Sequence, residues 1–154
     1  MEGGGALMTQ GIHTVDLLRW IMGPVERVSA RMGALVHDIE VEDDVTAFVE
    51  YENGATGVFV TSTSDTPGSN RFEVTGGNGK IVVENEALTF WRLRVPERQF
   101  NREYRGGFGQ PECWKCEVPI KGTAENHAGI TRNFVAAILD ATPLLAPGQE
   151  GIRG

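Results

Sequence analysis

Two alternating segments joined by Asn53-Gly54 constrain the fold of this chain most strongly. Residues 45–51 and 55–62 alternate their side chains with a period of two, which is the period of a β-strand. Asn-Gly is a preferred pair for a type I′ turn, the tight turn that joins two antiparallel strands. The sequence therefore predicts an antiparallel hairpin here. Phe48 and Phe59 lie opposite the valine-rich sides of their strands, so we expect a sheet that is covered on both faces.

Further strand and helix patterns flank this hairpin. Strands are predicted at residues 25–35, 72–75, 80–84 and 87–94. Helices are predicted after the three glycines at residues 3–5, closing at residue 23, and at residues 124–141. A length of 154 residues is that of one domain with a substantial core. Together these features predict an α+β fold with a large, mainly antiparallel open sheet and helices on one face.

The charge balance limits the partners of this chain. It carries 14 Lys and Arg against 21 Asp and Glu, a formal net charge of −7. Nucleic acids and anionic membrane surfaces repel such a charge, so we expect neither as a partner. No apolar run approaches the roughly 20 residues that a membrane helix requires, and the start of the sequence has no secretory signal pattern. We therefore expect a cytoplasmic protein.

The stretch over residues 3–23 combines a glycine loop with a helix that carries a histidine. Helical spacing places Thr9, His13 and Asp16 on one face. An imidazole on a helix that follows a glycine loop is suited to proton transfer. The residues alone leave a second interpretation open, in which His13 is a hydrogen-bonded core residue and Asp16 pairs with Arg19 on the helix surface.

Residues 3–30, GGGALMTQGIHTVDLLRWIMGPVERVSA, resemble the segment that opens the second domain of the Gfo/Idh/MocA oxidoreductases. A weaker resemblance extends over residues 41–94 and 124–151. Members of this family pair an N-terminal Rossmann domain with a C-terminal α/β domain that carries the substrate site and the oligomer interface. The resemblance therefore implies that this chain is such a C-terminal domain.

The resemblance also implies roles for individual residues. His13 matches the family's active-site histidine, which makes it the expected catalytic group for proton transfer or hydroxyl binding. Asp16 matches an acid three residues later, and Thr9 stands where many members carry an aspartate. A hydroxyl can orient an imidazole but cannot stabilise imidazolium as a carboxylate does. Thr9 and Asp16 are thus expected to orient His13, and the approach to the nicotinamide is expected to be lined by Gly3, Gly4 and Gly5.

No dinucleotide-binding unit is recognisable in these 154 residues. Such a unit needs a βαβ segment with a glycine-rich turn, but the glycine cluster at residues 76–80 runs into a strand pattern. The family's Glu-Lys-Pro motif, which supplies its catalytic lysine, is also missing. We therefore expect residues 1–154 to form a single substrate-binding and oligomerisation domain without the N-terminal Rossmann domain and the last C-terminal helix. NAD or NADP would be bound mainly by the missing domain, so we expect neither a bound cofactor nor activity in this chain alone.

These implications define the expected function. The chain would be the substrate-binding and oligomerisation domain of an NAD(P)-dependent oxidoreductase that acts on a sugar- or polyol-like hydroxyl group of a small molecule. It would form a homodimer or a higher homo-oligomer through a sheet face that carries Phe48, Phe59, Phe90 and Trp91. The alternative is a non-catalytic dimeric binding or scaffold domain that retains the sheet, which the missing Rossmann domain and Thr9 favour.

Three other segments contain residues that can carry chemistry. The acidic segment 37–44 lacks the spacing of a calcium or magnesium loop, so we expect a solvated loop there. Cys113 and Cys116 form a CxxC pair without a following helix or a second pair of ligands, so incidental cysteines are favoured over a zinc or thiol-redox site. Arginines and aromatic residues interleave over residues 97–121, where we expect an irregular strand pair or a loop. We expect no metal site.

Overall fold

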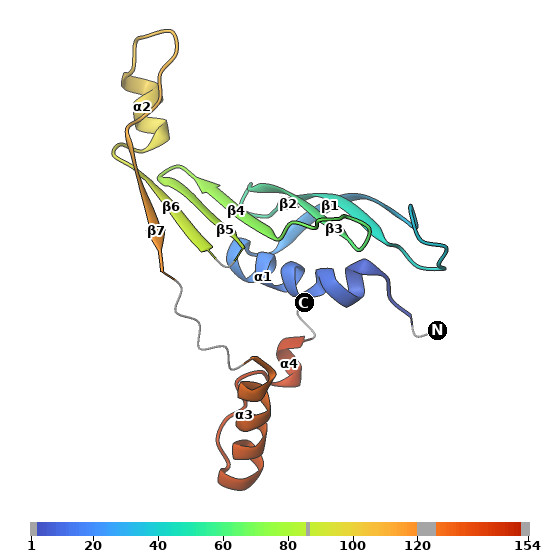
Figure 1. Cartoon of the computed structure of the whole chain (residues 1–154). Helices are drawn as coiled ribbons and strands as arrows, with labels where there is room; N and C mark the ends of the chain where they lie inside the picture. Colours follow the sequence, from blue (N-terminus) through green and yellow to red (C-terminus); the bar gives the residue numbers. More distant parts are fainter. Residues whose placement is uncertain (1–2, 86, 120–125, 152–154) are drawn as a thin grey trace. The chain divides into compact units, whose positions relative to one another are not determined.

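The strands of this chain divide between two antiparallel sheets, one of three strands and one of four. The computed structural model describes residues 3–85, 87–119 and 126–151 and divides the chain into two compact units (Figure 1). The first unit comprises Met1–Gly68 and Glu125–Gly154, and the second comprises Ser69–Ala124. The predicted α+β class and the antiparallel strands are confirmed. Two sheets are present instead of the expected single large sheet, because the third and fourth strands of the described chain are not hydrogen-bonded to each other.

The first unit holds the three-stranded sheet and most of the helical segments. These elements are η1 (Leu7–Gly11), α1 (Ile12–Met22), β1 (Val25–Gly33), β2 (Asp44–Tyr51), β3 (Thr56–Ser62), α3 (Asn126–Asp140) and α4 (Gly148–Gly151). The strand order is β1-β2-β3, so β2 is the central strand.

Helix α1 covers one face of this sheet (Figure 1). The core beneath it consists of buried side chains from the two hairpin strands, namely Ala47, Val49, Tyr51 and Phe59. Val15, Leu18 and Met22 of α1 pack against this core, as the helical spacing of apolar residues predicts.

The hairpin between β2 and β3 has a different turn from the predicted type I′ turn. The amide of Gly54 donates to the carbonyl of Tyr51 (2.8 Å), and the amide of Tyr51 donates to the carbonyl of Ala55 (2.9 Å). A type I′ turn needs a positive φ at both Asn53 and Gly54, but only Gly54 has one, at +82°. The pattern is instead that of a three-residue loop that ends in a left-handed residue. The side chain of Asn53 holds this turn, because it donates to the carbonyl of Met22 (2.8 Å) and accepts from the amide of Ala55 (2.9 Å).

This turn sets the register of the hairpin and reverses the predicted position of Phe59. Ala47 pairs with Phe59, and Phe48 pairs with Val58, so Phe59 shares a face with Ala47. Phe59 is 7% exposed and lies in the core, whereas Phe48 is 44% exposed on the opposite face. The prediction that Phe59 contributes to an exposed interaction face is therefore wrong.

The second unit is a four-stranded antiparallel meander. Its elements are β4 (Arg71–Gly76), β5 (Gly79–Glu84), β6 (Ala87–Leu93), α2 (Glu97–Glu103) and β7 (Cys113–Val118). Helix α2 lies in the connection between β6 and β7, beyond the ends of both strands (Figure 1). A helix and a strand thus occupy the part of the chain where an irregular strand pair or a loop was expected. Residues 120 and 121 of that segment lie outside the described residues.

Phe90 and Trp91 lie on opposite faces of this second sheet. Trp91 pairs with Lys80 and with Lys115, so these three side chains share one face. The two ammonium nitrogens lie 5.7 and 5.8 Å from the centre of the indole ring. Phe90, as the preceding residue of the strand, faces the other side. The four aromatic residues that were expected on one oligomer face therefore do not form a common surface.

Helix α3 confirms the predicted C-terminal helix, although residues 124 and 125 lie outside the described residues. Several of its large apolar side chains are exposed, including Ile130, Phe134 and Ile138. Among the helices that the structure describes, none is both long and apolar enough to cross a lipid bilayer.

Candidate functional site

An open pocket of about 800 Å³ in the first unit contains the two main candidate residues of helix α1, His13 and Asp16. Arg19 and Trp20 from the same helix line it as well. The opposite wall comes from the segment that ends in α4 and consists of Ala146, Pro147, Gly148, Glu150 and Gly151. The pocket therefore brings together an imidazole, two carboxylates, a guanidinium and an indole.

The polar side chains of α1 in this pocket are not engaged with one another. In the part of the chain that the structure describes, the side chains of His13, Asp16 and Arg19 make no hydrogen bond or ion pair, and all three are exposed. The interpretation of His13 as a core residue with an Asp16–Arg19 pair beside it is therefore wrong. His13 and Asp16 are instead available to a ligand that enters the pocket.

Thr9 lies one turn before His13, in the π-helical turn η1 that leads into α1. Its hydroxyl donates to the carbonyl oxygen of Gly5 (2.9 Å), and its amide donates to the same oxygen (3.1 Å). A hydroxyl has one proton to donate, so Thr9 can meet the imidazole of His13 only as an acceptor. The structure does not pair Thr9 with His13, and the orienting role of Thr9 stays a prediction.

The three glycines at the start of the chain differ in what surrounds them. A Cβ at Gly4, whose φ is +153°, would lie 2.8 Å from Cβ of Met8. A Cβ at Gly5 would overlap the carbonyl oxygen and the carboxylate of Glu42. Packing within the chain thus requires glycine at both positions. Gly3 has no neighbouring atom within 4 Å of that position, so only Gly3 leaves open space of the kind that a cofactor would need.

The acidic segment before β2 contains a buried carboxylate that the sequence analysis did not identify. Asp43 is 0% exposed. It accepts hydrogen bonds from the amides of Leu35 (2.6 Å), Val36 (3.0 Å) and His37 (2.8 Å) and contacts Nδ1 of His37 (2.9 Å). The amides of Leu35 and His37 lower the pKa of Asp43 well below its usual range, because they stabilise the ionised form. Part of the segment is therefore an ordered structural loop.

Glu42, the neighbour of Asp43, joins this loop to the start of the helical segment. Its carbonyl oxygen accepts from the amide of Ala6 (2.8 Å), and its carboxylate Oε1 accepts from the amide of Leu7 (3.1 Å). No local sequence signal reveals this contact, because its partners lie 35 positions apart. In the described parts of the chain, no group of three or more His, Cys, Asp or Glu side chains is arranged to hold a metal ion.

The CxxC pair lies in strand β7, and both thiols are free and exposed. Cys113 and Cys116 are three positions apart in an extended strand, so their side chains point to opposite faces of the sheet. They cannot bind one metal ion together in this conformation. The structure therefore gives no support to a zinc or thiol-redox site.

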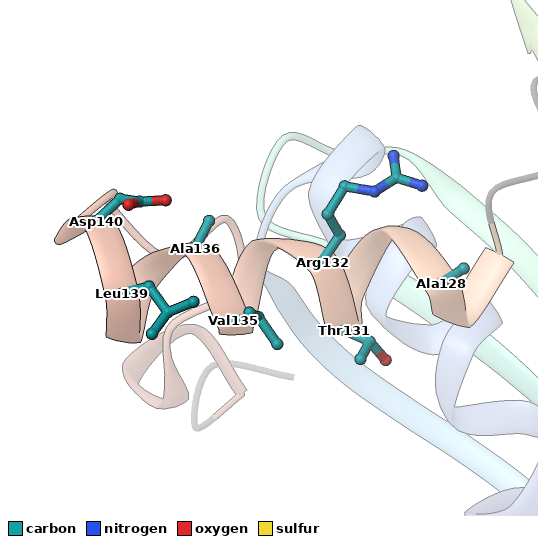
Figure 2. Close-up of a pocket in the computed structure, with 7 residues that line it drawn as sticks. All are labelled: Ala128, Thr131, Arg132, Val135, Ala136, Leu139 and Asp140. Carbon is teal, nitrogen blue, oxygen red and sulfur yellow. The ribbon is translucent and has the colours of Figure 1, made fainter.

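A second surface depression of about 580 Å³ follows one side of helix α3. Figure 2 shows that all of its lining side chains come from this one helix: Ala128, Thr131, Arg132, Val135, Ala136, Leu139 and Asp140. It contains no pair of titratable groups suited to acid–base catalysis, so the pocket around His13 remains the candidate site.

Comparisons with known proteins identify the family of this chain. A family model described as the GFO/IDH/MocA C-terminal domain matches residues 1–82, the part of the chain that contains His13 and Asp16. D-apiose dehydrogenase of Rhizobium rhizogenes is 35% identical over 54% of this chain and 31% of its own length. D-apiose dehydrogenase of Paraburkholderia graminis is 24% identical over 93% of this chain and 38% of its own length. The chain thus spans about a third of the length of these curated relatives.

A solved structure supports the same assignment of the fold. The WlbA dehydrogenase from Bordetella pertussis, crystallised with NADH and UDP-GlcNAcA, is 25% identical and superposes with a TM-score of 0.68. The match covers 97% of this chain and 40% of that protein. The chain belongs to the GFO/IDH/MocA family and corresponds to its C-terminal domain.

Proposed function

We propose that this chain is the substrate-binding and oligomerisation part of an NAD(P)-dependent oxidoreductase that acts on a sugar- or polyol-like hydroxyl group. The observation that supports this proposal most is the open pocket in which His13 and Asp16 lie exposed, with no hydrogen-bond or ion-pair partner for their side chains among the described residues. Relatives named D-apiose dehydrogenase support a sugar as the substrate, and the WlbA complex with NADH supports a nicotinamide cofactor.

In this proposal His13 accepts the proton of the substrate hydroxyl and passes it on to solvent. An imidazole nitrogen accepts the hydroxyl proton while the adjacent C–H bond breaks, and the pocket opens to solvent so that the proton can leave. Asp16 lies on the next turn, where it can accept a hydrogen bond from the imidazole or from a second hydroxyl group. When bound, a nicotinamide cofactor supplies the hydride acceptor.

The described residues do not themselves form a nicotinamide site. Both sheets are antiparallel, and no glycine-rich turn leads from a strand into a helix among the residues that the structure describes. Such a turn is what holds the pyrophosphate in a Rossmann domain. We therefore propose that NAD or NADP is bound mainly outside these 154 residues, with Gly3 at the approach, and that this chain alone is inactive.

The test replaces His13 in the full-length protein encoded at this locus. We expect turnover of NAD(P)+ with at least one sugar or polyol, followed by NAD(P)H absorbance, and a loss of about 10²–10⁴-fold in kcat/KM in His13→Gln. His127→Gln is the matched control, because His127 is exposed on α3 and does not line the pocket. Equal activity in wild type and His13→Gln would exclude the proposed role of His13.

The oligomerisation role is proposed for the face of the first sheet that α1 does not cover. Phe48, Val58 and Val60 are exposed there, and an apolar patch of this kind favours association with a second copy. Sedimentation of the purified chain at micromolar concentration should reveal a dimer or a higher oligomer, and Phe48→Lys should shift the distribution toward monomer. A clean wild-type monomer would contradict this part of the proposal.

A non-catalytic binding or scaffold domain is the second candidate function. The engagement of Thr9 with Gly5, at a position where a carboxylate is frequent in the family, favours it. Full-length protein that binds a sugar in calorimetry but reduces no NAD(P)+ would support this candidate over the first.

A further inference from the structure

The helical segment that carries His13 begins at a contact with a residue far along the chain. Its first amides, those of Ala6 and Leu7, donate to the carbonyl oxygen (2.8 Å) and to Oε1 (3.1 Å) of Glu42. The first amides of a helix have no partner within the helix, and no side-chain cap from Ala6 supplies one here. Glu42 therefore acts as an N-terminal cap that a separate loop provides, and its charge is favourable at this end of a helix.

A glycine at position 5 allows Glu42 to lie close to the start of the helical segment. A Cβ at Gly5 would overlap both the carbonyl oxygen and the carboxylate of Glu42, so glycine is what permits the approach. Ala6 is almost fully buried at the same contact.

The loop that presents Glu42 is itself fixed by the next residue. Asp43 is buried and holds three amides of the preceding loop. Its own amide donates to the carbonyl of Gly33 (3.1 Å), and its carbonyl accepts from the amide of Thr63 (2.9 Å). The backbone next to Glu42 is thus anchored between the end of β1 and the residue that follows β3, and the cap has a defined position.

Between the cap and His13 lies the π-helical turn η1. A π turn accommodates one more residue than an α turn, so its conversion to α-helix would rotate every later side chain about the helix axis. The far end of η1 is held by Gly11, which packs closely against Phe59 and Thr61 of β3. The near end is held by Glu42, so both ends of the π turn are in contact with other parts of the first unit.

We propose that Glu42 is a positioning residue of the candidate site, which holds the start of η1 so that the π turn persists and His13 faces the pocket. This inference rests on the proposed function only for the role of the pocket, because the geometry of the helix start is independent of the activity.

The test compares Glu42→Ala with Glu42→Gln in the 154-residue chain by NMR. Glu42→Ala should shift the amide signals of residues 7–16 and the imidazole signals of His13. Glu42→Gln should restore most of the wild-type pattern, because its Oε1 still accepts from Leu7. Glu40→Ala, in an exposed position of the same loop, is the matched control and should leave His13 unchanged.

Unchanged His13 signals in Glu42→Ala, or shifts in Glu42→Gln or Glu40→Ala as large as those in Glu42→Ala, would overturn the inference. If Glu42→Ala does not fold, Glu42→Asp decides, because it keeps the charge and withdraws the carboxylate by one methylene; the same His13 shifts are then expected. In the full-length protein, Glu42→Ala should lower kcat about tenfold or more with little change in KM for the cofactor. Absence of any activity would count against the proposed function, and the NMR result would still decide the role of Glu42.

Discussion

Asp38 and Asp43 lie in the same acidic loop, yet their surroundings are opposite. Asp43 is buried under three amides and the imidazole of His37, whereas Asp38 is exposed and has no bonded partner among the described residues. In a loop that folds around a carboxylate in this way, one side chain accepts hydrogen bonds from several backbone amides. In an ordinary exposed loop, such amides bond to water instead. Asp43 therefore stabilises the fold, and its contribution depends on its ionised state.

Asp43→Asn should lower the stability of the first unit at pH 7. It should also make that stability fall less when the pH is lowered toward 3. The pKa of Asp43 is lowered in the folded state by the amides of Leu35 and His37. Its contribution is therefore present above the ordinary aspartate pKa of about 4 and is lost as pH falls toward the folded-state value. Thermal unfolding between pH 7 and pH 3 should show a lower midpoint for Asp43→Asn at pH 7 and a smaller fall on acidification. Asp38→Asn should follow the wild type, and an identical pH profile for Asp43→Asn and wild type would contradict the prediction.

Phe48 and Phe59 provide a second contrast between two residues of one type. Phe59 lies in the core and Phe48 on the uncovered face, so truncation to alanine should have unequal effects. Phe59→Ala should cost about 3–5 kcal/mol of unfolding free energy, because it leaves a cavity. Phe48→Ala should cost about 1 kcal/mol or less. Urea denaturation followed through the NMR signals of the β2 amides measures both, and equal losses would place Phe59 outside the core.

At the scale of the element, the hairpin shows which structural features a sequence pattern can predict and which it cannot. Alternation identified both strands and the two sides of each one, and these hold in the structure. It did not identify which side of β2 lies on the same face of the sheet as which side of β3, because that depends on the length of the turn. A two-residue turn at Asn53-Gly54 would set Phe48 opposite Phe59, whereas the observed turn shifts the register by one residue and sets Ala47 opposite Phe59. The side-chain bond from Asn53 to Met22 that favours the observed turn is a tertiary contact, which alternation does not reveal.

The candidate site, too, was predictable from the sequence only in part. The resemblance located His13 and Asp16, and the helix that carries them forms as predicted. The contacts that hold this helix, through Glu42 and Gly11, join segments distant in sequence and carry no local pattern. A π-helical turn likewise has no distinct apolar periodicity over a few residues, so η1 was not predictable.

The packing of the helical segment on the sheet predicts a strict size limit at Gly11. A Cβ there would lie 3.0 Å from Cζ of Phe59 and 3.2 Å from Cγ2 of Thr61. Gly11→Val should therefore destabilise the first unit by about 1–3 kcal/mol through overpacking. Gly76→Val is the matched control, because a Cβ at Gly76 meets no atom within 4 Å; its effect should stay within about 0.5 kcal/mol. Urea denaturation measures both, and a neutral Gly11→Val would show that the helix can move away from the sheet.

At the scale of the whole molecule, the two units differ in the amount of apolar surface that they bury. Of the seven buried apolar residues in the described chain, six lie in the first unit: Ala6, Val45, Ala47, Val49, Tyr51 and Phe59. Only Val82 lies in the second unit. Since burial of apolar area is the main favourable term in folding, the two sheets should not have the same stability when the chain is studied alone.

Hydrogen exchange of the isolated chain should therefore distinguish the two sheets. Amides of the central strand β2 are paired on both sides and lie over the core, so they should exchange last. Amides of β5 are also paired on both sides, but their sheet buries little, so their protection should be lower by a factor of about ten or more. The comparison of β2 with β5 controls for hydrogen bonding, because both are interior strands, and leaves burial as the difference. Equal protection in β2 and β5 would mean that the two units unfold together, and that contacts other than apolar burial hold the second sheet.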